Sequence, residues 1–442
     1  MADFPITDYG AVSDGTTDDA GAIQRAIDAC TSAGGGRVIV PAGRRFVAGP
    51  FELKTNVTLH LEAGSRVEAN TDTSLYTDSP FRNRGEGGMW IRAHRATNVA
   101  ITGTGTLDGR GRAFMVDEEP THYNYGIVDG VDNRPHLLTL IDCDGVTIRD
   151  ATFEDAAYWC IHPAGCTDVL IHGVRVNNSL KIRNCDGIDI DHCRNVRISD
   201  CWIRSADDSI CIKNRRDYDH CGPCENITIT GCILTSTSCA LKLGSENMDT
   251  MRNIVVDSCI IRDSNRGLGI QNRDEGSIEN VTFSNITVES RLFHDVWWGK
   301  ADPIYVTAFR RPADAQNRLP AGATEGRVGP VRNIRFSNIS CDGENGVYVA
   351  GSRDSRIEGI VFDNVDVTIR KTSKYPGGVY DRRPCDVEGI LEAPAAGLRL
   401  SRADDVRLRD VAVRFTEPRQ DYYGEAVALD DVRGLRIEGL EG

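Results

Sequence analysis

Residues 280–288, Asn-Val-Thr-Phe-Ser-Asn-Ile-Thr-Val, begin with a small polar residue and place apolar side chains at alternate positions. Residues 333–341, Asn-Ile-Arg-Phe-Ser-Asn-Ile-Ser-Cys, repeat this phrase 53 positions later. Such alternation is typical of a strand with one buried face. The phrase recurs along nearly the whole chain, and its first residue is Asn56, Asn98, Gly145, Asp168, Asn195, Asn226, Asn253, Asn280, Asn333, Gly359, Asp405 or Gly434.

The spacing of this phrase predicts the architecture. Successive steps between Gly145 and Asn280 are 23, 27, 31, 27 and 27 residues. Such a period is typical of a parallel β-helix, whereas a propeller blade needs about 40 to 50 residues. The 53-residue step fits either two coils or one coil with a long loop. We therefore expect residues 1–442 to form one domain, an all-β, right-handed parallel β-helix whose stacked coils occupy about residues 56–442.

The first 50 residues predict a different element. Ile23, Ala26, Ile27 and Cys30 follow helical spacing, with acidic residues before them and glycines after them. This pattern indicates an amphipathic helix over about residues 18–31. A helix here would cap the open end of the stack, where unpaired strand edges favour aggregation.

A second strand recurs between the phrases, in Gly187-Ile-Asp-Ile-Asp, Ser209-Ile-Cys-Ile-Lys, Ala240-Leu-Lys-Leu-Gly, Gly267-Leu-Gly-Ile-Gln and Pro303-Ile-Tyr-Val-Thr. When these stretches are aligned, their second and fourth positions are all aliphatic and should face the core. The remaining positions form outward columns of mixed chemistry, typical of a binding surface: Asp189, Cys211, Lys242, Gly269, Tyr305 and Asp191, Lys213, Gly244, Gln271, Thr307.

Charge and hydropathy limit the partners. The chain has 51 basic and 65 acidic residues, a net charge of -14, which argues against a general nucleic-acid or anionic-membrane surface. No run of 18 apolar residues occurs, and the start, Met-Ala-Asp-Phe-Pro, lacks the basic and apolar regions of a signal peptide. We expect a cytoplasmic protein.

The fifteen cysteines favour a reduced compartment. Their number is odd and many stand singly in strand-like runs, so we expect them to serve as small apolar side chains and not as disulfides. Cys221 and Cys224 form a single Cys-x-x-Cys without a second ligand pair, which disfavours zinc or redox chemistry. We expect no metal and no other cofactor.

Acidic residues precede two of the recurring strands. Asp207 and Asp208 precede the strand at 209–213. Asp186 lies one coil earlier, at the position that aligns with Asp208. These residues fall where the chain turns, so both neighbouring acids can face one cleft. Neighbouring coils are about 4.8 Å apart, so at least one carboxyl pKa should rise. A raised acid beside ionised neighbours suits a glycosidase; the alternative is a solvated turn.

These motifs carry a family resemblance. Asn-Cys-Asp-Gly-Ile-Asp-Ile-Asp-His-Cys (184–193), Ala-Asp-Asp-Ser-Ile-Cys-Ile-Lys (206–213), Leu-Gly-Ser-Glu (243–246) and Arg-Gly-Leu-Gly-Ile-Gln-Asn (266–272) resemble, in order and spacing, glycoside hydrolase family 28, the polygalacturonases and their relatives. The resemblance spans about residues 4–291 and includes the N-terminal segment and the stretch Trp159-Cys-Ile-His-Pro.

The resemblance implies hydrolysis with inversion by a single displacement. In that family the aspartate that matches Asp207 is the usual general acid, and those that match Asp186 and Asp208 hold and activate water. The residues alone do not divide acid from base. An inverting site is expected to separate acid and base by about 6.5 to 9.5 Å.

Two family features are absent. The polygalacturonase Gly-His-Gly is missing, with Ser238 and Cys239 where its histidine would fall. The Arg-x-Lys that grips a galacturonate carboxylate on the leaving-group side is replaced by Gly269 and Gln271. An ordinary endo-polygalacturonase is therefore doubtful.

Other residues are candidates to bind substrate. Lys242, Lys213 and Arg266 lie near the acids in the aligned columns and could bind a carboxylate, and Gln271 occupies a family binding position. His162, aligned below Asp189, could bind substrate or be a structural histidine.

Aromatic residues after the last well-matched coil are also candidates. Trp298, next to Trp297, could stack on a sugar ring or pack in the core, and Tyr305 lies in the same outward column as Lys242.

We therefore expect a glycosidase for pectin-type oligosaccharides, such as an exo-acting α-galacturonidase. A glycosidase for a non-uronate or mixed, rhamnogalacturonan-like linkage is an alternative that the lost Arg-x-Lys favours. A β-helix lyase or epimerase would need a base at the C5 proton, often with Ca²⁺ or a Lys or Arg base. A non-catalytic carbohydrate-binding protein has no use for clustered acids.

Overall fold

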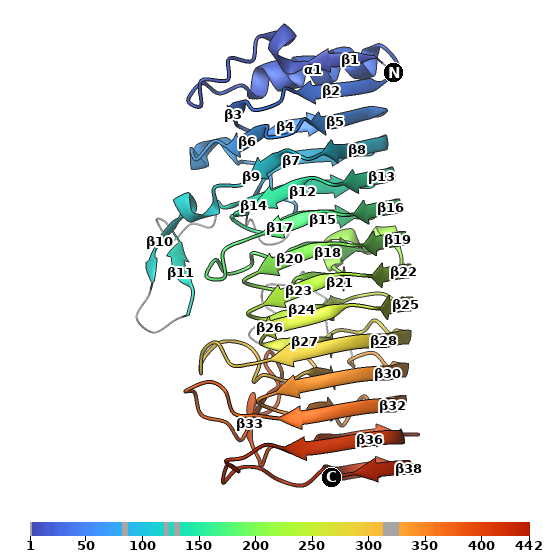
Figure 1. Cartoon of the computed structure of the whole chain (residues 1–442). Helices are drawn as coiled ribbons and strands as arrows, with labels where there is room; N and C mark the ends of the chain where they lie inside the picture. Colours follow the sequence, from blue (N-terminus) through green and yellow to red (C-terminus); the bar gives the residue numbers. More distant parts are fainter. Residues whose placement is uncertain (1, 82–86, 119–122, 128–132, 313–326) are drawn as a thin grey trace. The chain divides into compact units, whose positions relative to one another are not determined.

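A computed structural model describes residues 2–81, 87–118, 123–127, 133–312 and 327–442. Contacts between residues group the chain into two compact units, 1–207 and 208–442. In each unit short parallel strands follow one another around the coils of an all-β, right-handed parallel β-helix, as expected (Figure 1). That the whole chain forms one domain stays a prediction.

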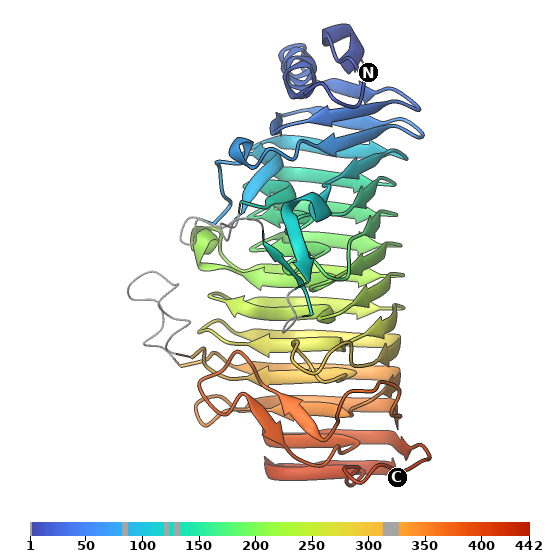
Figure 2. The same ribbon diagram turned by 90° about the vertical axis from the view of Figure 1, so that its left-hand side faces the viewer.

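The first unit begins with a helix and continues with strands. Helix α1 spans Ala20–Ser32, within two residues of the expected range, and buries Ile23, Ala26 and Ile27 against the first strands. Figure 2 shows this helix beside the first strands at the N-terminal end of this unit. The strands are β1 Asp3–Pro5, β2 Gly36–Val40, β3 Arg45–Ala48, β4 Phe51–Leu53, β5 Val57–Leu61, β6 Arg66–Ala69, β7 Gly88–His94, β8 Thr97–Gly103, β9 Thr106–Asp108, β10 Met115–Glu118, β11 Tyr125–Ile127, β12 Pro135–Ile141, β13 Asp144–Arg149, β14 Thr152–Glu154, β15 Ile161–Ala164, β16 Thr167–His172, β17 Arg175–Asn177, β18 Ile188–Asp191, β19 Arg194–Ser199 and β20 Trp202–Ser205.

The second unit consists of strands and connecting segments. Its strands are β21 Ile210–Asn214, β22 Cys224–Thr230, β23 Ile233–Ser236, β24 Cys239–Asn247, β25 Met251–Asp257, β26 Ile260–Ser264, β27 Arg266–Asn272, β28 Ile278–Ser290, β29 Ile304–Ala308, β30 Val331–Gly343, β31 Val347–Ala350, β32 Ile357–Ile369, β33 Val379–Asp381, β34 Ile390–Glu392, β35 Leu398–Asp404, β36 Arg407–Phe415, β37 Val427–Arg433 and β38 Arg436–Glu441. Strands β33 and β34 pair antiparallel, as the arms of a hairpin.

The register of the second unit confirms the aligned columns. Strands β21, β24, β27 and β29 pair in parallel, so Ile210, Leu241, Leu268 and Ile304 lie in one buried column. Lys242, Gly269 and Tyr305 form the outward column beside it. We call this row of strands, which β31, β35 and β37 continue, the site sheet.

The 53-residue step is one coil with a long insertion. Strand β28 pairs directly with β30, Thr282 opposite Arg335, without a coil between them. The residues between these strands include β29 and a long connection. The stack Phe283–Phe336–Phe362 continues across the insertion, with ring centroids 5.0 and 5.1 Å apart.

The first residue of each recurring phrase shares one backbone conformation. All twelve have positive φ values between 52° and 71°, in the left-handed region. This region is unfavourable for most L-residues but accessible to Gly, Asn and Asp, which are the three residue types found there. Several of the side chains also bond along the stack: Asn98 Nδ2 donates to Asn56 Oδ1 over 3.1 Å, and Asn333 Nδ2 donates to Asn280 Oδ1 over 3.3 Å.

The cysteines line the interior as free thiols. All fifteen are free, and all but Cys221 are buried. In the first unit Cys143, Cys166 and Cys193 interact along the stack. Burial and the neighbouring thiols raise the pKa of Cys166 well above its ordinary value, so it stays a neutral thiol.

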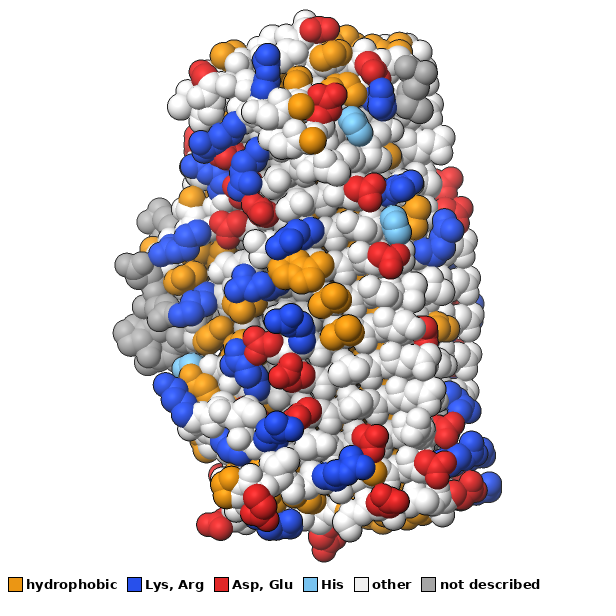
Figure 3. Space-filling view, in the orientation of Figure 1, with side chains coloured by type: hydrophobic (Ala, Val, Ile, Leu, Met, Phe, Trp, Pro, Cys, Tyr) orange, Lys and Arg blue, Asp and Glu red, His pale blue; other side chains and the backbone are white. Residues whose placement is uncertain are grey.

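Charged side chains on the exterior are mixed. Arg45 pairs with Glu68, and Arg66 pairs with Asp108 at 2.6 Å and with Glu154 at 2.9 Å. Basic and acidic side chains stand next to each other over the face in Figure 3. Within the described part of the chain, no helix is sufficiently long and apolar to cross a membrane.

The left-handed conformation of the first residue of each recurring phrase, which we call the corner residue, predicts how much stability a mutation there should cost. Replacing Asn333, at φ 57°, by Ala should lower the free energy of unfolding by about 1 to 2 kcal/mol, because Cβ strains this conformation and the amide ladder is lost. Replacing it by Gly should be nearly neutral. Denaturant unfolding measures both variants, and equal losses for Ala and Gly would show that the corner conformation contributes little.

Candidate active site

Two of the expected aspartates meet in the first unit. Asp186 precedes β18 and is 2% exposed, and Asp207 follows β20 and is half-buried. The turns are held by main-chain contacts: the Cys160 N–H donates to the Asp186 carbonyl over 3.1 Å, and the Asp207 N–H donates to the Cys185 carbonyl over 3.4 Å. A carboxylate oxygen of Asp186 lies within 4.8 Å of one of Asp207.

This separation allows the two carboxylates to share a small molecule. A hydrogen bond between oxygens is about 2.7 Å long, so one water or one sugar hydroxyl can contact both groups. The carboxylate oxygens of Asp186 and Asp207 approach within 4.8 Å of each other, closer than the separation of about 6.5 to 9.5 Å expected between the carboxyl groups of an inverting site. Inversion stays a prediction.

Asp208 begins the second unit. It is 1% exposed; its Oδ2 accepts a hydrogen bond from Lys242 Nζ at 2.7 Å and its Oδ1 accepts one from Ser238 Oγ at 3.3 Å. The peptide bond to Asp207 keeps these two acids neighbours. Residues 206–209 lie between β20 and β21, so the alternation rule does not apply to them, as expected. Lys242 thus neutralises a buried carboxylate, one of the two roles predicted for it.

Ser238 has a role that the sequence reasoning missed. It is one of the two residues that the family resemblance aligns with a polygalacturonase histidine, and it donates to Asp208. The preceding turn is fixed by Ser236, whose Oγ accepts from the Ser238 N–H over 2.8 Å. The signal available in the sequence was a short polar residue one coil beyond an acid.

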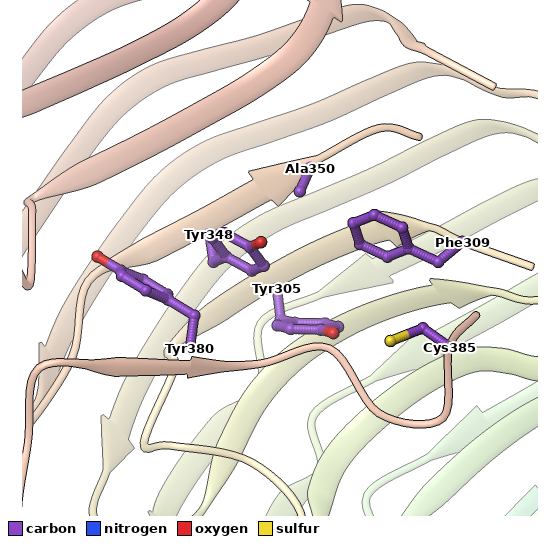
Figure 4. Close-up of a cluster of buried hydrophobic side chains, with 6 residues drawn as sticks. All are labelled: Tyr305, Phe309, Tyr348, Ala350, Tyr380 and Cys385. Atoms are coloured by element: carbon purple, nitrogen blue, oxygen red, sulfur yellow. The ribbon is translucent and has the colours of Figure 1, made fainter. Parts of the chain in front are cut away.

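A hairpin covers part of the outward face of the site sheet. We call residues 379–392, with strands β33 and β34, the wall hairpin. Its Tyr380 and Cys385 pack on Tyr305, Tyr348 and other buried side chains of the site sheet (Figure 4). Rings of Tyr348 and Tyr380 stack with centroids 4.7 Å apart. The predicted open face is therefore closed at this level by a segment far away in sequence.

Three predicted substrate-binding residues contact the wall hairpin. Arg266 Nη2 donates to the Asp381 carbonyl over 2.7 Å, and Tyr305 Oη donates to the same oxygen over 2.8 Å. Gln271 Nε2 donates to the Arg383 carbonyl over 2.8 Å. Tyr305 is only 1% exposed. These contacts give the three residues a structural role, and direct substrate contact stays a prediction.

Charges beneath the wall hairpin compensate one another. Burial raises the pKa of Asp302, which pairs with Arg266 at 3.4 Å. Burial also opposes ionisation of Asp381, but Arg383 and Arg266 outweigh it and hold the pKa of Asp381 below its ordinary value. Burial lowers the pKa of Lys300. The wall hairpin thus places the ionised carboxylate of Asp381 near the buried cations Arg266 and Lys300.

The remaining predicted binding residues lie in different environments. Lys213 is buried on β21. Trp298 is half-buried, with the Arg383 guanidinium 5.2 Å from its ring centre and Trp297 edge-on at 6.3 Å. His162 is fully buried; its Nε2 lies 3.4 Å from Asp191, and its ring meets Trp159 edge-on at 4.8 Å. Substrate roles for these three residues stay predictions.

Comparison with known proteins identifies the family of the chain. The family model described as glycosyl hydrolases family 28 matches residues 30–378. A probable polygalacturonase of Arabidopsis thaliana is 25% identical over 402 residues, 89% of this chain and 79% of the relative. An exopolygalacturonase of Zea mays is also 25% identical over 402 residues, covering 88% and 89% of the two chains.

Solved structures share the fold. The family 28 exopolygalacturonase of Yersinia enterocolitica has a TM-score of 0.76 and 20% identity, covering 99% of this chain and 78% of that one. An exopolygalacturonase of Thermotoga maritima has a TM-score of 0.71 and 21% identity, covering 93% and 92%. The chain belongs to glycoside hydrolase family 28 and is a glycoside hydrolase.

The aspartates should dominate catalysis. Replacing Asp186, Asp207 or Asp208 by Asn should lower kcat at least about a hundredfold, because Asn keeps the shape but not the proton chemistry. The melting temperature should stay close to the parent value for the Asp186 and Asp207 variants, whereas Asp208→Asn also breaks the buried pair with Lys242 and should lower it. Reducing-end release and thermal melts test this. Asp366→Asn, on the far less buried pair with Arg414, is the control and should retain activity. Near-full activity in all three variants would contradict the assignment.

The Lys242–Asp208 pair should be costly to break. In the variant Lys242→Met the Asp208 carboxylate stays buried without its cation, which should lower the free energy of unfolding by about 3 to 5 kcal/mol. The matched change Lys54→Met breaks the exposed pair with Asp28 and should cost at most about 1 kcal/mol. Denaturant unfolding of both variants measures the difference, and equal costs would argue against a buried pair.

Proposed function

We propose that this protein is an inverting, exo-acting hydrolase of pectin-type oligosaccharides, an α-galacturonidase. The acid pair Asp186 and Asp207, with Asp208 joined to it, supports hydrolysis. The observation that carries exo action is the wall hairpin, which occupies the outward face of the site sheet at β27, β29 and β31. The named polygalacturonases and exopolygalacturonases among the relatives support the pectin substrate.

The three acids would divide the reaction as the family resemblance implies. Asp207 donates its proton to the glycosidic oxygen as the bond from that oxygen to the anomeric carbon breaks. Asp186 and Asp208 hold a water whose oxygen attacks the same carbon from the opposite side, and one of them accepts the proton that the water loses. Lys242 Nζ donates to Asp208 Oδ2 over 2.7 Å and holds this carboxylate in place.

The position of the wall hairpin supports attack at a chain end. Asp208 precedes β21, Lys242 lies on β24, and the hairpin contacts begin on β27. Two strand spacings, about 10 Å, separate Asp208 from that level. A long polymer cannot continue along this face in that direction, whereas a short leaving group fits.

A second candidate is a glycosidase for a mixed, rhamnogalacturonan-like linkage. Gly269 and Gln271 replace the pair that would grip a galacturonate carboxylate on the leaving-group side, and Gln271 is bonded to the hairpin. A neutral sugar on that side would need no such pair. We further propose that the protein works in a reducing compartment such as the cytoplasm, which its fifteen free cysteines support.

Product analysis tests these proposals. Incubation with oligogalacturonides should yield new reducing ends and monomeric galacturonate, and proton NMR should show the inverted anomer first. A retained anomer would contradict the single displacement, and ultraviolet absorbance from an unsaturated uronate would indicate a lyase. Release only from rhamnogalacturonan fragments would favour the second candidate. Without products from either series, the protein would be a binding module.

A further inference from the structure

Arg273 is a buried arginine whose hydrogen bonds go to neutral oxygens. It is 1% exposed and lies directly after β27. Its Nε donates to the Pro384 carbonyl over 2.6 Å, and Nη2 donates to the Arg382 carbonyl over 2.9 Å and to Tyr305 Oη over 3.4 Å. Its Nη1 donates to the Asn272 carbonyl over 2.9 Å and to Thr307 Oγ1 over 3.0 Å.

This arrangement requires a guanidinium. Burial is the main cause that lowers the pKa of Arg273, the expected effect on a cation removed from water. Such a burial is costly, so the group is retained only where its hydrogen bonds are fully used. The planar fork of five N–H groups lets one side chain reach two carbonyls of the wall hairpin and three oxygens around the site sheet, which an ammonium cannot do in one plane.

The anchored stretch of the wall hairpin comprises residues 381–384. Arg266 and Tyr305 bond to Asp381, and Gln271 bonds to Arg383, on either side of the Arg382 carbonyl that Arg273 holds. Residues 381–384 are therefore fixed on β27 and β29 by several side chains. Arg273 contributes two of these contacts and is itself buried.

We propose that Arg273 is a positioning residue that fixes the wall hairpin and thereby limits the leaving group to a short stretch of sugar. The proposal rests on the proposed function and deepens it. The leaving-group side follows from the family resemblance, in which the positions of Gly269 and Gln271 face that part of the substrate. Because the hairpin stands about two strand spacings, about 10 Å, from Asp208, it shortens the cleft without touching the acids.

The experiment compares chain-length preference in matched variants. The probes are oligogalacturonides from the dimer to the octamer, and kcat/KM is measured for each with the parent protein, Arg273→Met and Tyr305→Phe. The parent should release short leaving fragments from chains of every length. We call the rate of octamer cleavage that releases a leaving fragment longer than two sugars, divided by the rate that releases a shorter one, the chain-length ratio. In Arg273→Met this ratio should rise about tenfold, with kcat for the dimer within about threefold of the parent value.

Two additions separate anchoring from general stability. Arg356→Met removes a comparable set of hydrogen bonds to Asp404 and Asp431, away from the hairpin, and should lower the melting temperature without changing the chain-length ratio. Amide hydrogen exchange over residues 379–393 should accelerate in Arg273→Met and not in Arg356→Met. Tyr305→Phe removes the bond to the Asp381 carbonyl and the 3.4 Å bond from Arg273, and it provides a milder test where Arg273→Met does not fold.

The outcomes distinguish the two proposals. If amide exchange in the wall hairpin accelerates but the chain-length ratio stays unchanged, the hairpin does not limit the leaving group. If amide exchange stays unchanged in Arg273→Met, Arg273 does not fix the hairpin. A parent protein that releases long and short leaving fragments from the octamer equally well would also overturn the limiting role. A parent protein inactive on the whole series would contradict the proposed function alone, and the exchange measurement would still decide whether Arg273 holds the hairpin.

Discussion

The left-handed residue at the start of each recurring strand is the constraint on which the structure depends. A coil closes only if the backbone bends sharply before the strand, and this bend needs a positive φ that most side chains disfavour. The twelve corner residues are all Asn, Asp or Gly, and some of the amides also bond to the corner of the neighbouring coil. These corners define the register, and the register places Lys242 opposite Cys211, where its ammonium reaches Asp208.

Much of the fold could be predicted because its determinants are local and repeat. The alternation of side chains decides which residues face inward, and the corner residues mark the period. Helix α1 could also be placed, since its apolar spacing and flanking residues lie within one short stretch. The proximity of Asp186 and Asp207 was accessible for the same reason, because Asp186 aligns with Asp208 of the next coil and Asp207 directly precedes Asp208 in the sequence.

The covering of the site sheet could not be predicted. Residues 379–392 lie more than a hundred positions from Gln271 and Arg273, which hold them, and they carry no repeat that would reveal where they pack. Arg266, Gln271 and Tyr305 appear in the sequence as outward polar residues of a binding face. Only the folded chain shows that their polar atoms meet carbonyls of a distant segment.

The insertion between β28 and β30 shows what the corners permit. Forty residues, 291–330, separate these paired strands, yet Phe283 and Phe336 stack nearly parallel, with 6° between the ring planes. Each corner restarts the strand in the correct phase whatever the length of the preceding connection. Errors of length therefore do not accumulate along the chain, and a family built on such coils can lengthen a connection into a new substrate-shaping element while its core stays intact. Specificity and stability can in this way evolve almost independently.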